Sequence, residues 1–156
     1  MIISDATILI TLINIDEFRV LKLFIDSIII PHEVYNEVSQ KASAKKYLDH
    51  EINEGFISVE SYTDESLFRE INYILDAGES ASITLAIEKR LPLIIDERKG
   101  RRFAQKQDIE IIGLVGILRF LYLEKRLCRE EILAIIEKLN GSDFRVSSKL
   151  LGLILA

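Results

Sequence analysis

The chain alternates short, strongly apolar runs with segments in which apolar residues recur at helical spacing, and this alternation limits its fold more than any other feature. The runs Ile2-Ile3, Ile28-Ile29-Ile30 and Leu93-Ile94-Ile95 are too short for helices and rich in β-branched residues, which favours strands. Strands without polar alternation are typical of a parallel sheet that helices cover on both faces. The sequence therefore predicts an α/β fold with a central, mostly parallel sheet.

The other elements follow from the same patterns. Two further strands are expected at residues 56–59 and 109–112. Helices are expected at residues 8–13, around Val34 and Val38, at 67–75, around 83–87, at 98–107, 114–127 and 130–139, and after a Ser147 cap up to Leu155. No linker, repeat or low-complexity segment interrupts the 156 residues, so a single domain spanning residues 1–156 is expected.

Two carboxylates directly follow predicted strands. Asp5 ends the first apolar run, and Asp96 ends the run 93–95. In parallel sheets the functional crevice lies beyond the carboxyl ends of the strands, so both side chains are expected at that edge. Glu37 comes one or two helical turns after the strand 28–30, and Glu79 stands in the first turn of a predicted helix.

Each of these four acids has a purely structural explanation when it is considered alone. Asp5 and Asp96 can cap the helices that follow them, and Glu37 and Glu79 can be solvated or dipole-favoured helix residues. If the four converge, they need a counter-charge, because two like charges ~4 Å apart repel by about 4 kcal/mol at an effective dielectric constant of ~20. Oxygen ligands favour Mg²⁺ or Mn²⁺, and such a site with open positions suits phosphodiester hydrolysis.

The net charge of the chain is −5, which is unusual for a protein that holds nucleic acid by bulk charge. A nucleic-acid partner therefore requires a local basic patch, and the segment 98–102 (Arg-Lys-Gly-Arg-Arg) supplies one directly after Asp96. Arg98 and Arg101 are candidates for phosphate contacts. Arg101 is an equally good candidate to pair with the acids themselves.

Several other classes of site lack their residues. His32 and His50 form no triad or zinc spacing, and no glycine-rich phosphate loop is present. The single cysteine, Cys128, excludes an intramolecular disulfide and fits a reducing compartment. The N-terminal residues do not read as a signal peptide, and the longest apolar stretch is shorter than the ~20 residues that span a bilayer. We expect a cytoplasmic protein without a membrane partner.

Motifs along nearly the whole chain resemble those of the PIN-domain nucleases. Residues 78–86 (Gly-Glu-Ser-Ala-Ser-Ile-Thr-Leu-Ala) match the G-E-x-x-x-I-x-L-A signature of a prokaryotic branch of that family. The opening Ser4-Asp5-Ala6-Thr7, the Pro-x-x-Val-x-x-Glu stretch at 31–37, the acid pair followed by Gly-Arg at 96–101, and the Gly-x-x-Gly at 113–116 resemble its other motifs in the same order.

This resemblance implies a three-layer α/β/α fold and a metal-dependent endoribonuclease, often the toxin of a toxin–antitoxin pair. Carried over by motif, Asp5, Glu37, Glu79 and Asp96 form a catalytic site for Mg²⁺ or Mn²⁺. Thr7 would orient Asp5 or a bound water, or make a simple hydrogen bond at the start of its helix. The implied partners are RNA and a small antitoxin protein.

Other functions stay open at this point. A non-catalytic interaction module with a PIN-like fold would keep the acids for structure alone. Haloacid-dehalogenase-like phosphatases also begin with an Asp after the first strand, but they need a second Asp where this chain has Thr7. A homodimer is also open, because the apolar residues of 114–127 and 150–155 either form a dimer face or are buried within one chain.

Overall fold

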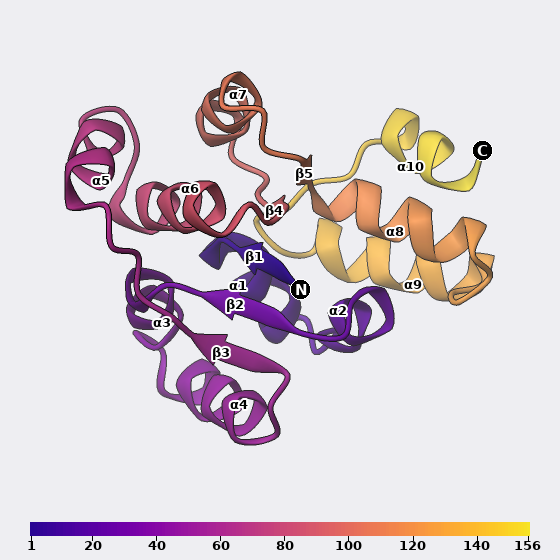
Figure 1. The fold of residues 1–156 in the computed structure, drawn as a ribbon. Coiled ribbons are helices and arrows are strands. Elements are labelled where there is room, and N and C mark those ends of the chain that lie inside the picture. The colour runs from indigo at the N-terminus through magenta and orange to yellow at the C-terminus, as the bar shows by residue number, and fades with distance from the viewer.

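A five-stranded sheet lies at the centre of the computed structural model, which describes residues 1–156 (Figure 1). All four strand pairs are parallel, and the strand order is β3-β2-β1-β4-β5. The strands are β1 (Ile2–Ser4), β2 (Ile28–Ile30), β3 (Ile57–Val59), β4 (Leu93–Ile94) and β5 (Ile111–Ile112). The helices are α1 (Ala6–Asn14), α2 (Arg19–Phe24), α3 (His32–Val38), α4 (Ala42–Asn53), α5 (Glu65–Asn72), α6 (Ala77–Lys89), α7 (Arg98–Lys106), α8 (Leu114–Leu123), α9 (Arg129–Asn140) and α10 (Ser148–Leu155).

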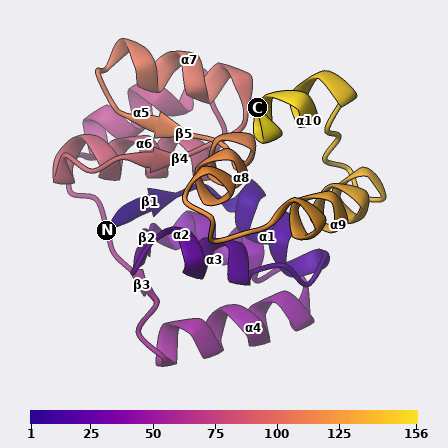
Figure 2. The same ribbon diagram turned by 90° about the vertical axis from the view of Figure 1, so that its right-hand side faces the viewer.

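The two faces of the sheet build two separate cores. Successive strand residues point to opposite faces, so Ile3 and Leu93 pack with residues of α5, α6 and α7, whereas Ile2 and Ile28 pack with residues of the other helices. Figures 1 and 2 show the sheet between these two helical layers. The predicted three-layer α/β/α architecture with a parallel sheet is confirmed.

The strand order decides where the predicted acids lie. The first strand, β1, is central: Ile3 pairs with Ile29 of β2 on one side and with Leu93 of β4 on the other. The end of β1 is therefore flanked by the ends of β2 and β4. This places Asp5 between the segments that carry Glu37 and Asp96.

The helix predicted at 67–75 is shorter in the structure. It ends at Asn72, and the N–H groups of Ile74 and Leu75 both donate to the carbonyl of Ile71. Leu75 is buried in the same core as Ile71, but from a turn rather than from a helix. Tertiary burial therefore explains the apolar residue that helical spacing alone had assigned to the helix.

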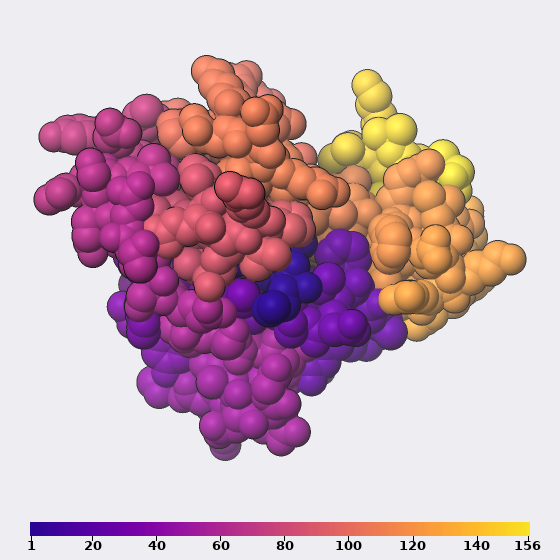
Figure 3. All heavy atoms as spheres, viewed as in Figure 1, coloured from indigo at the N-terminus to yellow at the C-terminus, as the bar shows by residue number.

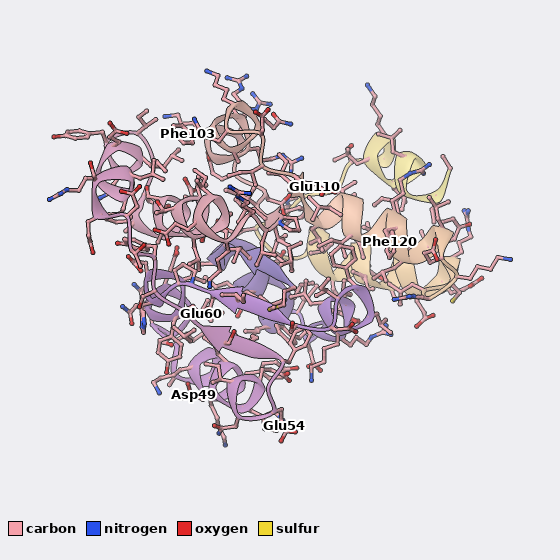
Figure 4. The ribbon with its side chains drawn as sticks, in the orientation of Figure 1. Asp49, Glu54, Glu60, Phe103, Glu110 and Phe120 are labelled. Carbon is pink, nitrogen blue, oxygen red and sulfur yellow. The ribbon has the colours of Figure 1, made fainter.

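The helix predicted at 114–127 also ends early, at Leu123, because Lys125 adopts a left-handed backbone conformation with φ of 58°. Helices α8, α9 and α10 form a lobe at one side of the molecule (Figure 3). Phe120, labelled in Figure 4, meets Phe24 of α2 edge-to-face with ring centroids 5.5 Å apart. No helix has the length and hydrophobicity needed to cross a membrane.

Burial within one chain accounts for most of the apolar residues that suggested a dimer face. Leu114, Ile117, Leu118 and Leu121 of α8 are buried, and Leu123 and Leu153 are the more exposed members of these segments. The homodimer stays a prediction.

Candidate metal centre

Asp5 is buried at the end of the central strand. Its backbone N–H donates to the carbonyl of Ile94 in β4 at 3.0 Å, so the sheet fixes its position. It occupies the N-cap position of α1, but its side chain makes no capping hydrogen bond, and capping therefore does not explain this buried carboxylate. Burial, reinforced by the negative charges of Asp76, Glu37 and Asp96, raises the pKa of Asp5 to about 7.

Glu79 lies in the first turn of α6 and is only 8% exposed, which excludes the interpretation as a surface acid. Burial raises its pKa to about 8, and the charges of Asp76 and Asp5 add to this effect. Asp76 is the N-cap of α6, and its Oδ1 accepts the backbone N–H of Glu79 at 2.8 Å. Asp76 was not among the predicted site residues. An Asp three positions before a Glu at a helix start is a recognised capping pattern that could have found it.

Three carboxylates from three elements surround Gly78: Asp5 is buried, and Glu37 and Asp76 are exposed. The position that a Cβ on Gly78 would occupy lies 2.9 Å from Oε2 of Glu37 and 3.7 Å from Oδ1 of both Asp5 and Asp76. None of these three acids forms an ion pair with a Lys or Arg. Burial and the charge of Asp76 raise the pKa of Glu37. The structure thus brings Glu37 to Asp5, as the resemblance implied.

Asp96 follows β4. The structural explanation that it caps α7 is wrong. Glu97 takes that role, since its Oε2 accepts the N–H of Gly100 at 2.9 Å. Oδ2 of Asp96 instead accepts the N–H of Leu114, the first residue of α8, at 3.2 Å. Burial raises the pKa of Asp96, although the bond from Leu114 and the charge of Arg101 oppose that rise.

The two arginines predicted as phosphate contacts have different surroundings. Nη1 of Arg101 donates to the carbonyl of Ile95 at 2.7 Å, and its charge acts on Asp96, so this arginine supports the end of β4. Arg98 is exposed in the first turn of α7 and forms no ion pair. Thr7 is exposed in the first turn of α1, and no hydrogen bond of its hydroxyl is seen.

The donor set suits a hard divalent cation, although no three His, Cys, Asp or Glu side chains stand close enough to hold an ion as they are. Carboxylates that repel one another are not expected to gather more closely until positive charge is added. The space that Gly78 leaves between Glu37, Asp5 and Asp76 is where such a charge would draw their oxygens together. The nearest side-chain atoms around this space are carboxylate oxygens, and oxygen donors are the ligands that Mg²⁺ and Mn²⁺ prefer, so the residues present fit either ion.

An open hollow adjoins these acids between α3 and α6, which pack against each other. Its volume is about 380 Å³, and both carboxylates and side-chain amides face it. It leaves room for part of a substrate next to the acidic residues. Its lining consists of Glu33, Asn36, Glu37, Gln40, Asp76, Ala77 and Gly78.

The comparison with protein families agrees with this geometry. A family model described as a PIN domain matches residues 1–156, the full length of the chain. The comparison with curated proteins finds no match. PIN domains are generally nucleases, and the acids at the carboxyl edge of a parallel sheet are in keeping with that class. The chain belongs to the PIN-domain family.

Proposed function

We propose that this protein is a metal-dependent endoribonuclease that acts in the cytoplasm and hydrolyses RNA phosphodiesters at a site for Mg²⁺ or Mn²⁺. The observation that carries the proposal is a group of acids without matching positive charge. Asp5 and Glu79 are buried and Asp96 is half-buried, and Arg101 is the one cation whose charge acts on them. A fold tolerates such a group where an ion or substrate supplies the missing charge. The proposed ligands are Asp5, Glu37, Asp76, Glu79 and Asp96.

The residues of the chain prepare this site for phosphodiester chemistry. Backbone hydrogen bonds from Asp5 to Ile94, and from Leu114 to the Asp96 carboxylate, hold two acids at fixed strand ends. The capping bond between Asp76 and Glu79 fixes the start of α6. A divalent ion, when bound, supplies positive charge that offsets the charge developing on the phosphodiester.

The direct test is cleavage of a labelled single-stranded RNA by protein that has been stripped with EDTA. We expect cleavage after addition of Mn²⁺ or Mg²⁺, none without metal, and none of a DNA of the same sequence. The Asp96→Asn variant should lose cleavage. The Asp143→Asn variant, which makes the same change at an exposed residue outside the proposed ligands, should keep it. Metal binding without any cleavage by the wild type would instead support the non-catalytic interaction module.

Arg98 provides a test of the RNA-binding part of the proposal. Arg98→Ala is expected to weaken binding to all RNA sequences about equally, and to reduce the slope of log affinity against log salt concentration by roughly 0.7 for a single strand. The measurement is fluorescence anisotropy at several salt concentrations, with Asp96→Asn as background to prevent cleavage. Lys149→Ala, an exposed basic residue in the first turns of α10, is the control and should leave the slope unchanged.

The role as the toxin of a toxin–antitoxin pair rests on the resemblance of the motifs to that branch of the family. Expression in a bacterium without a neutralising partner is expected to stop growth, and Asp96→Asn should abolish this effect. A small antitoxin would then restore growth by covering the acidic hollow between α3 and α6. Normal growth with active, soluble nuclease would argue against the toxin role while leaving the nuclease in place.

A further inference from the structure

The backbone conformation at Gly78 does not require a glycine. Gly78 lies in the first turn of α6, and its φ is not in the left-handed region that favours glycine; Gly55 is the one glycine of the chain with a positive φ. Alanine is the best helix former and glycine among the poorest, so a glycine here is unfavourable for the helix. The reason for it has to come from its surroundings.

Those surroundings are the carboxylates of the proposed metal centre. A Cβ at position 78 would lie 2.9 Å from Oε2 of Glu37, a separation that real Cβ atoms essentially never show. Oδ1 of Asp5 and Oδ1 of Asp76 would be next, both at the ordinary contact distance of 3.7 Å. The carboxylate of Glu37 is the far end of a flexible side chain, so it would move away while the backbone of α6 stayed in place.

Two other glycines near the acids face less yielding neighbours. A Cβ at Gly100 would come within 2.6 Å of Cδ1 of the buried Ile95. A Cβ at Gly113 would collide with Asp96, which Leu114 holds, and approach Nη1 of Arg101 to 2.8 Å. Gly78 therefore differs from both, because an added methyl group there has a single close obstacle and that obstacle can rotate.

We infer that Gly78 is a positioning residue of the metal centre: its missing side chain leaves the space in which Glu37 reaches from α3 toward Asp5 and Asp76. This inference rests on the proposed metal site and deepens it. A methyl group at position 78 fills that space and turns Glu37 away from the other two acids. The change removes one ligand from the ion without breaking the fold.

The experiment compares Gly78→Ala with Gly152→Ala. Gly152 lies in α10 with nothing within 4 Å of a Cβ, so it reports the same helical substitution away from any acid. Mn²⁺ affinity is measured by calorimetry on EDTA-stripped protein, and thermal unfolding is measured without metal. We expect Gly78→Ala to unfold at the same temperature as the wild type or higher, yet to bind Mn²⁺ about 10- to 100-fold more weakly. Gly152→Ala should bind Mn²⁺ like the wild type.

A double-mutant comparison shows whether the effect passes through Glu37. In a Glu37→Ala background, adding Gly78→Ala should cause no further loss of Mn²⁺ affinity. Equal affinity of Gly78→Ala and wild type overturns the inference and leaves the metal site standing. A lower unfolding temperature of metal-free Gly78→Ala also overturns it. So does a full loss of Mn²⁺ affinity when Gly78→Ala is added to the Glu37→Ala background. If the wild type itself takes up no Mn²⁺, the proposed metal site is wrong and the role of Gly78 falls with it.

Discussion

Asp5→Asn is expected to abolish metal-dependent cleavage and, at the same time, to make the metal-free protein more stable. The first effect should be on the order of 10³-fold or more, since Asp5 is the most buried and most central of the proposed ligands. The second follows from its pKa. A carboxyl group whose pKa rises from 3.8 in the unfolded chain to about 7 in the folded one destabilises the fold when it is ionised.

The sign of this stability effect sets its pH range. Below pH 3.8 the group is protonated in both states and costs nothing; the cost then grows with pH and is complete above pH 7. At pH 8 we expect Asp5→Asn to raise the free energy of unfolding by about 1–4 kcal/mol, and the unfolding temperature by roughly 2–4 °C for each kcal/mol. At pH 4 the gain should be nearly absent.

Calorimetric or fluorescence-monitored unfolding of EDTA-treated protein at pH 4 and pH 8 measures this difference. Asp143→Asn is the matched control, because Asp143 is exposed, has no left-handed backbone conformation and forms no ion pair. It should change stability little at either pH. A lower unfolding temperature of Asp5→Asn at pH 8 would show that the fold needs the negative charge of Asp5 rather than suffering from it.

The affinity for Mn²⁺ is expected to fall steeply between pH 8 and pH 6. Asp5, with a pKa of about 7, and Glu79, with a pKa of about 8, take up protons over this range and must release them before an ion binds. Each displaced proton lowers the affinity about tenfold per pH unit below its pKa. The combined loss from pH 8 to pH 6 is then on the order of 10²- to 10³-fold.

Titration calorimetry in two buffers with different ionisation enthalpies counts the released protons. About two protons should leave per bound ion at pH 6, and fewer than one at pH 8. The Glu79→Gln variant should release one proton fewer at pH 6 and show a shallower dependence. A Mn²⁺ affinity that stays constant from pH 8 to pH 6 is incompatible with these two acids as ligands.

The parts of the fold that could be predicted from the sequence are those where local pattern and tertiary burial agree. The β-branched run Ile28-Ile29-Ile30 is a strand because it is apolar on both faces, and the structure buries both faces. Helix α4 was not predicted, since it is mostly polar and buries few apolar side chains, such as Ala44 and Leu48. The end of α5 was placed too late because Leu75 serves the core from a turn.

The candidate site also combines residues that local rules could place with residues whose position depends on tertiary packing. Asp5 and Asp96 could be placed from physical rules, since the carboxyl ends of β1 and β4 meet at one edge. Glu37 and Glu79 could be predicted as site residues only from the family motifs, because the local sequence does not show that α3 packs against α6. Asp76 was not predicted, although its N-cap position could be recognised from the sequence. Its closeness to Glu37 depends on that same packing between helices.

The central position of β1 has a consequence for the protein while it is being made. Asp5 is synthesised before its neighbour β4 and before the Leu114 N–H that holds Asp96, which follows it by roughly a hundred residues. No segment shorter than residues 5–114 contains all of these groups. For the proposed ribonuclease, this order means that the site cannot form beside the messenger RNA being translated until residue 114 has been synthesised.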